Sequence, residues 1–357
     1  MKAAVLRGPE DLVIGRIERP VPGPGEVLVR VMATALCGTD LAVYRGHFKR
    51  VVYPIVPGHE SAGQVEENGP GVAGLQAGDR VVINPLAFCG RCRFCLRGDT
   101  PLCPQGGLLG RDRPGTFAEF AIVKAAQCHL LPESIGWGDA TGLVVLASVL
   151  RGQRRAGLSL GTSVVVIGQG VSGLLHTRLA KAAGASPVVG LSRTEWKLEL
   201  ALRLGADLVV EAGQRDAVDK VKRATRGGPD IVIDTVATDQ TLGMAFRLAG
   251  PGAVILAFGV DPSPISSLSS HTLYSGEYSV VGVRAMSPRD VDLAIRAVTD
   301  ERVDIGFLVT QRHPLDNLPA VMRAQTRSRE GLRTVFFPWG VPDGVEQGGA
   351  RDWATAE

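Results

Sequence analysis

The pattern of apolar and polar positions changes near the middle of the chain. Up to about residue 130, short alternating stretches such as 27–31, 63–67 and 79–83 are separated by Gly and Pro. Alternation over a few residues between turn signals is typical of half-buried strands. The first part of the chain is therefore predicted to be a β-rich lobe with few helices, whose loops can present ligands.

From about residue 158 the apolar runs become continuous and alternate with helical patterns. The first run covers residues 163–167, and five more follow at 187–191, 207–210, 230–234, 253–257 and 278–282. Continuous apolar runs are typical of parallel strands buried on both faces. Six such strands, with helices between most of them, predict a doubly wound α/β domain.

A glycine-rich loop, Gly168-Gln169-Gly170-Val171-Ser172-Gly173, directly follows the first of these runs and precedes a helical stretch over residues 174–183. Glycines at this spacing let a backbone approach a pyrophosphate, which sits on the helix N-terminus. We therefore predict that Gly168, Gly170, Val171 and Gly173 bind a dinucleotide. The alternative is a doubly wound domain that binds no nucleotide.

The residues after the second run bear on the choice of cofactor. A carboxylate there normally binds the ribose hydroxyls of NAD, whereas arginine or small polar residues suit the 2′-phosphate of NADP. The segment reads Ser192-Arg193-Thr194, with no acid before Glu195. NADP(H) is therefore predicted over NAD(H), with Ser192, Arg193 and Thr194 at the phosphate. Otherwise Arg193 is only a solvated residue at a helix start.

Four cysteines in the β-rich part have the spacing C-x2-C-x2-C-x7-C: Cys89, Cys92, Cys95 and Cys103. Four thiolates can close around one tetrahedral zinc and leave no position for chemistry. We predict a structural zinc here, with arginines in the loop offsetting the charge of the tetrathiolate. An iron–sulfur cluster and a redox dithiol are the competing interpretations. Cys128 stands alone and is predicted to be a core residue.

A second set of metal-ligand types is spread over two segments. Cys37 supplies a thiolate, and His59 and Glu60 supply an imidazole and a carboxylate about two dozen residues later. Zinc accepts all three ligand types, and a catalytic zinc typically keeps three protein ligands and one open position. Taken alone these residues are common, so the alternative is that they bind no metal.

Composition narrows the class of protein. The 357 residues suggest two domains, and 45% hydrophobic with 21% charged residues exclude a disordered chain. No apolar run is long enough to predict a membrane span. The net charge of +3 is spread without the basic block typical of nucleic-acid binding. The N-terminus lacks the pattern of a signal peptide, so a cytoplasmic location is predicted.

The two ligand segments, the four-cysteine loop and the glycine-rich loop together make residues 1–340 resemble the zinc-containing medium-chain alcohol and polyol dehydrogenases. The resemblance implies a GroES-like catalytic domain over residues 1–150 and 288–340. It also implies a Rossmann NADP-binding domain over residues 151–287, and a polar tail remains at 341–357. A small-molecule substrate and a homodimer or homotetramer are what the resemblance implies.

The same resemblance gives roles to single residues. Cys37 and His59 are implied to be ligands of a catalytic zinc. Glu60 stands next to His59, at a position whose residue coordinates the metal in some members of the family. Thr39 is implied to pass on the proton of the substrate hydroxyl. Asp40 is implied to contact a metal ligand without binding the metal itself.

Further cofactor contacts are predicted at strand ends. Thr235, Phe258 and Gly259 follow the fourth and fifth strands of the doubly wound domain, where parallel sheets bind ligands. They are equally ordinary strand-to-helix turns. By resemblance, Arg333 stands where relatives often have a basic residue near the cofactor.

Two positions depart from the family pattern. Val144 stands where relatives have another zinc ligand, and Ala42 where many have a histidine that carries the proton to solvent, with His47 nearby. If three ligands still hold zinc, the chain is expected to transfer a hydride between NADP(H) and a secondary alcohol or its ketone. Otherwise a metal-free reductase of an activated carbonyl or double bond is expected, or a non-catalytic NADP(H)-binding protein.

The segment at residues 44–50 bears on the substrate. It reads Tyr-Arg-Gly-His-Phe-Lys-Arg and brings basic and hydroxyl groups close in sequence to the proposed metal ligands. These groups favour a polar or anionic substrate such as a sugar, polyol or cyclitol. The alternative is a solvated loop with no role in binding.

Overall fold

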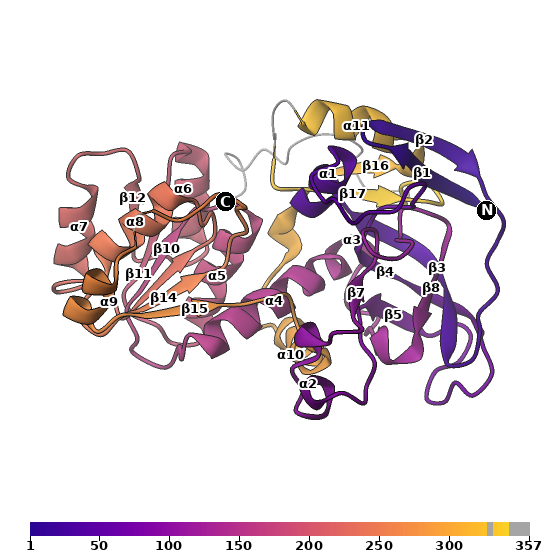
Figure 1. Ribbon diagram of the computed structural model, residues 1–357, viewed down its shortest axis with the longest axis horizontal. Helices are drawn as coiled ribbons and strands as arrows, with labels where there is room; N and C mark the ends of the chain where they lie inside the picture. Colours follow the sequence, from indigo (N-terminus) through magenta and orange to yellow (C-terminus); the bar gives the residue numbers. More distant parts are fainter. Residues whose placement is uncertain (267, 327–330, 343–357) are drawn as a thin grey trace. The chain divides into compact units, whose positions relative to one another are not determined.

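The structure is a computed structural model that describes residues 1–266, 268–326 and 331–342. The chain forms two compact units (Figure 1). Unit 1 runs from Met1 to Ala147 and resumes at Met286, and unit 2 is Ser148–Ala285. Residues 343–357, which make up most of the predicted polar tail, lie outside the described residues.

Unit 2 is built on a six-stranded parallel sheet with the order β12-β11-β10-β13-β14-β15. Its strands are β10 (Val164–Ile167), β11 (Val188–Ser192), β12 (Leu208–Glu211), β13 (Ile231–Asp234), β14 (Val254–Ala257) and β15 (Ser279–Gly282). This is the strand order of doubly wound dinucleotide-binding domains, which bind their ligand where the order reverses, beside β10. The predicted doubly wound domain is confirmed.

Helices cover both faces of this sheet (Figure 1). They are α5 (Val171–Ala182), α6 (Glu195–Arg203), α7 (Ala217–Ala224), α8 (Asp239–Leu248) and α9 (Ser270–Gly276). Because successive side chains of a strand point to opposite faces, Val165 and Val164 enter two different apolar cores. Burial on both faces explains why the strands read as continuous apolar runs.

Unit 1 contains a sheet with the order β16-β17-β3-β4-β5-β9, in which β8 also pairs with β3. Its strands are β3 (Glu26–Ala35), β4 (Glu60–Asn68), β5 (Arg80–Ile83), β8 (Phe120–Lys124), β9 (Cys128–Leu130), β16 (Val309–Pro314) and β17 (Arg333–Phe337). Two strand pairs lie outside it: β1 (Lys2–Gly8) with β2 (Asp11–Arg16), and β6 (Leu86–Ala87) with β7 (Gly107–Leu108).

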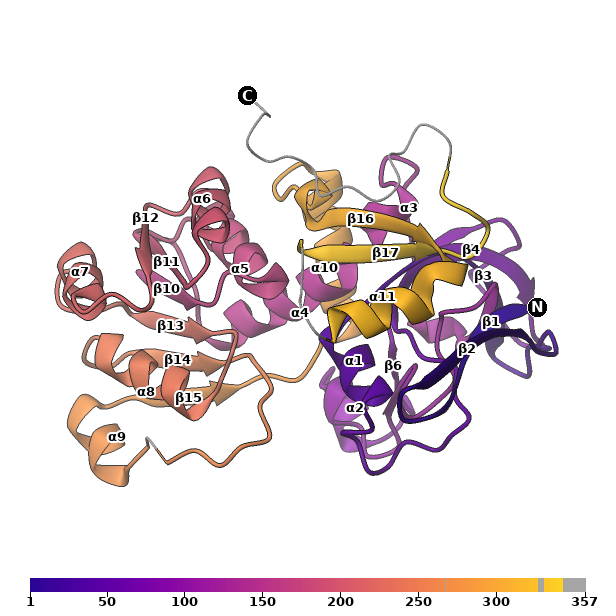
Figure 2. The ribbon, with the colours of Figure 1, turned by 90° about the horizontal axis from the view of Figure 1, so that it is seen from above.

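The lobe is β-rich as predicted, and the end of the chain completes it. Its helices are α1 (Gly38–Tyr44), α2 (Arg93–Leu96), α3 (Trp137–Ala140), α10 (Pro288–Thr299) and α11 (Leu318–Gln325), and α4 (Gly142–Arg155) spans the division between the units. Short 3-10 turns lie at Thr100–Leu102, Ala125–Gln127, Gly306–Leu308 and Leu315–Asn317. β17 pairs with β3, and Figure 2 shows β16, β17 and α11 beside the N-terminal strands.

The helices bear on membrane insertion as well. In the described part of the chain, no helix is both long enough and apolar enough to cross a membrane.

Candidate functional site

The candidate metal site of unit 1 begins at the N-terminus of α1. Cys37 caps this helix, and Asp40 Oδ2 accepts a hydrogen bond from the backbone N–H of Cys37 (2.9 Å). The other oxygen, Oδ1, accepts a bond from the N–H of Gly58 (3.1 Å) and lies 3.0 Å from His59 Nδ1. Asp40, which is buried, therefore ties together the two segments that carry Cys37 and His59.

The contact with Asp40 fixes how His59 can act. If the Nδ1–H group donates to this carboxylate, Nε2 remains as the lone-pair nitrogen, an arrangement common behind metal-bound histidines. Burial alone lowers the pKa of His59, but the charges of Asp40 and Cys37 and hydrogen bonds to them raise it well above its ordinary value. The site therefore favours a cation, either a proton or a metal ion.

Close backbone packing holds the segment that leads into His59. Gly58 has a φ of +98°, and a Cβ there would lie 2.7 Å from the ring of Phe117. A Cβ on Gly110 or on Gly115 would lie 2.6 Å or 2.3 Å from the backbone of Gly58. Glycine is therefore required at all three positions, and the chain before His59 has little room to move.

The donor set fits a zinc ion. One ligand atom each from Cys37, His59 and Glu60 lies within 4.8 Å of the others, and the last two residues are buried. A tetrahedral zinc with bonds of about 2.0–2.3 Å places its ligands about 3.3–3.8 Å apart, so a small inward shift suffices. The structure therefore brings together the three residues that were predicted as ligands. That these residues bind zinc is a proposal.

Glu60, one of the three candidate ligands, also forms a buried ion pair with Arg333. Arg333 Nη2 lies 2.7 Å from Glu60 Oε2, and the side chains are 3% and 6% exposed. The same guanidinium donates to the carbonyl oxygen of Thr141 (2.6 Å) and to its Oγ1 (3.3 Å). Arg333 was predicted near the cofactor, which stays a prediction, but these contacts lie within unit 1. No periodicity or spacing in the sequence signals them.

The two departures from the family pattern have clear positions. Val144 is buried in the first turn of α4, three residues after Thr141. Ala42 lies within α1, where its carbonyl oxygen accepts the backbone N–H of His47, whose side chain is exposed. Thr39, in the first turn of α1, is half-buried two residues from the candidate ligand Cys37.

The second candidate metal site lies in the loop around α2. Its ligand atoms, from Cys89, Cys92, Cys95 and Cys103, all lie within 4.8 Å of one another. Measured sulfur–sulfur distances are 3.5 Å for Cys92–Cys95 and 3.9 Å for Cys89–Cys95, against about 3.8 Å around a tetrahedral zinc. The cysteines are free thiols, so their arrangement fits the predicted structural zinc.

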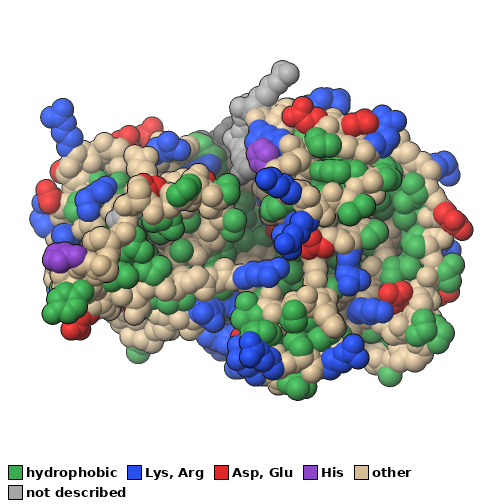
Figure 3. Space-filling model, in the orientation of Figure 1, with side chains coloured by type: hydrophobic (Ala, Val, Ile, Leu, Met, Phe, Trp, Pro, Cys, Tyr) green, Lys and Arg blue, Asp and Glu red, His purple; other side chains and the backbone are tan. Residues whose placement is uncertain are grey.

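Backbone N–H groups, neighbouring thiols and nearby basic side chains set the electrostatics of this four-cysteine loop. Backbone N–H groups of Arg91 and Cys92 lower the pKa of Cys89 to about 6, whereas burial and neighbouring thiols raise the pKa of Cys95 to about 12. Figure 3 shows Lys and Arg side chains gathered over the region of α2. Nearby positive charge offsets the negative charge that four thiolates would carry.

The glycine-rich loop of unit 2 joins β10 to α5. Gly168 has a φ of +85°, and a Cβ there would lie 2.6 Å from Thr235 Oγ1, which donates to the Ile167 carbonyl oxygen (2.9 Å). A Cβ on Gly173 would lie 1.8 Å from the Gly168 carbonyl oxygen. Gly170, just before Val171 opens the helix, faces open space within 4 Å. Packing fixes two of the glycines, and the third leaves room for a pyrophosphate.

The predicted phosphate residues lie at the end of β11. Ser192 is buried and its Oγ accepts the N–H of Thr194 (3.1 Å), the residue that caps α6. Arg193 between them is exposed. A hydroxyl, a guanidinium and the N-terminus of α6 therefore meet at one corner of the sheet, a combination suited to an anion.

The further cofactor contacts predicted at strand ends follow two neighbouring strands. Thr235 follows β13, and Phe258 and Gly259 follow β14, which pairs with β13 in parallel. A Cβ on Gly259 would lie 2.5 Å from the backbone of Val236. The ring of Phe258 packs edge-on against His176 at 4.6 Å. The three predicted residues thus share the carboxyl edge of the sheet with the glycine-rich loop.

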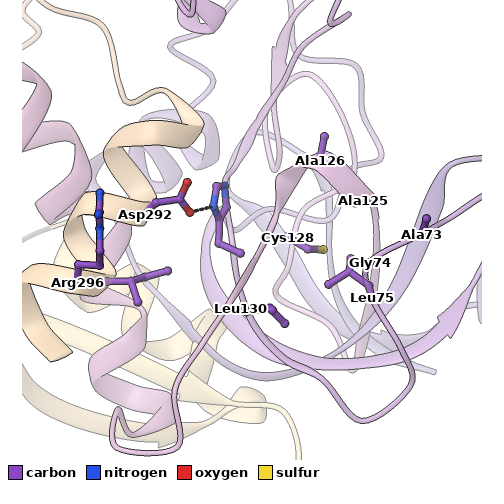
Figure 4. Close-up of a pocket in the computed structure, with 11 residues that line it drawn as sticks. Ala73, Gly74, Leu75, Ala125, Ala126, Cys128, Leu130, Asp292 and Arg296 are labelled. Atoms are coloured by element: carbon purple, nitrogen blue, oxygen red, sulfur yellow. Dashed lines mark hydrogen bonds and ion pairs between the residues drawn. The ribbon is translucent and has the colours of Figure 1, made fainter.

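A separate cavity of about 550 Å³ lies within unit 1 (Figure 4). It is lined by Leu75, Cys128, Leu130 and residues of α10, among them Asp292, which pairs with His129 (2.6 Å). Burial raises the pKa of the Cys128 thiol to about 12, in keeping with the predicted core role. None of the candidate metal ligands lines this cavity.

Comparison with known families gives two matches. Residues 23–133 match the alcohol dehydrogenase GroES-like domain, and residues 172–300 match the zinc-binding dehydrogenases. The first match lies in unit 1, and the second covers the glycine-rich loop from Ser172 onward.

Similar proteins cover most of the chain. The L-threonine 3-dehydrogenase of Pyrococcus abyssi is 35% identical over 75% of this chain and 78% of its own. The sorbitol dehydrogenase of Halalkalibacterium halodurans is 29% identical over 95% and 99%. A crystal structure of a putative zinc-binding dehydrogenase from Sinorhizobium meliloti, bound to NADP, has a TM-score of 0.85 at 29% identity, over 94% and 99% of the two chains.

Proposed function

The chain belongs to the zinc-binding dehydrogenases, a family of oxidoreductases, and on that premise we propose that it transfers a hydride between NADP(H) and a secondary alcohol or its ketone. The observation that carries the proposal is the convergence of Cys37, His59 and Glu60, with Asp40 behind the histidine. A scaffold that only bound a nucleotide in unit 2 would have no physical need for this set.

Zinc at these residues would act as a Lewis acid on the substrate oxygen, and NADP(H) would exchange the hydride. Cys37, His59 and Glu60 would hold the metal as three protein ligands, the number typical of a catalytic zinc, although Val144 cannot contribute. Asp40 fixes the orientation of His59 through the contact at Nδ1.

Thr39 is the residue proposed to handle the proton. A hydroxyl both donates and accepts hydrogen bonds, so it can take a proton from the substrate hydroxyl and pass one on. Its place in the first turn of α1, the helix that Cys37 caps, keeps it near the candidate metal ligands. Ala42 cannot carry the proton further, and His47 is exposed, so we propose that solvent receives it.

The preference for NADP(H) rests on the end of β11. Ser192, Arg193 and Thr194 supply a hydroxyl, a positive charge and a backbone N–H, and none of them would repel a 2′-phosphate. The bound NADP of the Sinorhizobium meliloti relative supports this preference. Comparing kcat/KM for NADP and NAD tests it, and a preference for NAD would contradict it.

A polar substrate is proposed. The relatives named for sorbitol and L-threonine act on molecules rich in hydroxyl or charged groups. Residues 45–50 place Arg45, His47, Lys49 and Arg50 at exposed positions shortly after α1. A panel of sugars, polyols and cyclitols beside alkyl alcohols of equal size tests this. Turnover of the alkyl alcohols alone would contradict it.

Metal removal separates this function from its alternatives. Chelation that empties the Cys37 site should abolish turnover, and zinc should restore it. Full turnover after chelation would favour the metal-free reductase of an activated carbonyl or double bond. Tight NADP(H) binding without turnover of any panel member would favour the non-catalytic binder.

A homodimer or homotetramer is part of the proposal. β15 is the edge strand of the unit 2 sheet, and its Val280 is 44% exposed. An exposed apolar edge strand favours pairing with a second copy. Light scattering that gave the mass of one chain at micromolar concentration would contradict this.

A further inference from the structure

The ion pair between Arg333 and Glu60 is the feature that the proposed function leaves unexplained. Both side chains are almost fully buried, and the distance between Nη2 and Oε2 is 2.7 Å. Placing two charges in the interior is costly, and replacing such a pair with apolar residues is often neutral or stabilising. Stability alone therefore does not account for this pair.

The arginine is held from more than one side. Its guanidinium donates to Thr141 through Nη2 (2.6 Å) and Nε (3.3 Å), and its backbone N–H donates to Thr310 Oγ1 (3.2 Å). Thr141 Oγ1 is itself fixed by donating to the Gly138 carbonyl oxygen (2.7 Å). The direction in which Arg333 presents its charge to Glu60 is thus set by rigid neighbours.

We propose that Arg333 is a positioning residue, which holds Oε2 of Glu60 so that Oε1 is presented to the metal. The inference rests on the proposed zinc function and deepens it. Because Val144 cannot ligate, Glu60 must serve as the third protein ligand, and the orientation of its carboxylate decides whether the set of three is complete.

Charge balance supports this assignment. Cys37 as a thiolate, Asp40 and Glu60 bring three negative charges into a buried region. A divalent zinc and the guanidinium of Arg333 bring three positive charges. The loaded site is then neutral, which suits a region from which water is largely excluded.

The test compares metal binding by the full-length protein and its variants. Arg333→Met removes the charge and the donors while keeping an unbranched side chain, and Arg333→Lys keeps the charge but cannot reach Glu60 and Thr141 together. Arg80→Met is the matched control, because Arg80 is held by the carbonyl of Ile135 and the ring of Trp137 and contacts none of the candidate ligands. Zinc affinity is measured by chelator competition, and the ligand geometry by the absorption spectrum of cobalt bound at the Cys37 site.

We expect Arg333→Met to bind zinc at the Cys37 site about 10–100-fold more weakly, the range for residues that orient metal ligands. Arg333→Lys should show a smaller loss, and both should alter the cobalt spectrum. Arg80→Met should match the unaltered protein. If Arg333→Met does not fold, Arg333→Lys decides in the same assays.

Two failures are distinguishable. An unaltered protein that binds only one zinc per chain, in the four-cysteine loop, would overturn the proposed zinc function and this inference with it. An unaltered protein that binds two, with variants of Arg333 that keep full affinity and an unchanged spectrum, would overturn this inference alone.

Discussion

The two candidate zinc sites of unit 1 are built in opposite ways. The four-cysteine loop draws its ligands from Cys89 to Cys103, within fifteen residues counted inclusively, and three of them are partly exposed. The other site joins residues from the start of α1 and the start of β4. Asp40 contacts His59 there, and Arg333, far along the chain, contacts Glu60. A local site can be read from spacing, whereas a site assembled across the fold depends on contacts that spacing does not record.

The largest expected effect comes from removing a ligand of the assembled site. His59→Ala should lower kcat/KM at least about 10³-fold, because Lewis-acid activation contributes several kcal/mol. Steady-state kinetics measure this, and the thermal unfolding midpoint serves as the control for folding. A variant with near-normal turnover would show that the site performs no metal chemistry.

Removing a ligand of the local site should act on stability. Cys95→Ser leaves three thiolates for the structural zinc and should lower the free energy of unfolding by about 3–5 kcal/mol, in the range of the most disruptive single substitutions. Urea denaturation with and without added zinc measures the change. A stability equal to that of the unaltered protein would mean that the loop does not depend on its metal.

Weakening the support behind a ligand should have a smaller effect. Asp40→Asn keeps the shape of the side chain but removes the negative charge beside His59 Nδ1, and zinc affinity at the Cys37 site should fall about 10–100-fold. Chelator competition measures it, and the four-cysteine loop in the same molecule is the internal reference. Equal losses at both sites would point to general unfolding instead.

An effect no larger than that of Asp40→Asn is expected outside both metal sites, in unit 2. Arg193→Ala should raise the KM for NADP about 10–100-fold, since a charge-assisted hydrogen bond contributes about 1.5–3 kcal/mol, and should leave the KM for NAD nearly unchanged. A parallel loss for both cofactors would assign Arg193 a role other than phosphate recognition.

Sequence predicted the strands of unit 2 closely, because burial on both faces leaves a continuous apolar run. The predicted run 163–167 and the observed β10, Val164–Ile167, differ by one residue. The same reading brought Cys37, His59 and Glu60 together as candidates, and the structure places their ligand atoms near one another.

Other parts of the site could not be predicted in this way. The contacts of Arg333 with Glu60 and Thr141 join three segments far apart in the chain, and no local pattern encodes them. The packing of Gly110 and Gly115 against Gly58 likewise appears only when three loops meet. Asp40 was assigned a supporting role from family resemblance, but only the fold shows that its two oxygens serve different segments.

The central claim is that the assembled site holds zinc although Val144, at the position where family resemblance implies a further zinc ligand, cannot bind a metal. Elemental mass spectrometry of protein purified without added metal tests it most directly, with His59→Ala as the control. The account predicts about two zinc ions per chain, falling to about one in His59→Ala. About one zinc in the unaltered protein, unchanged in the variant, would contradict it.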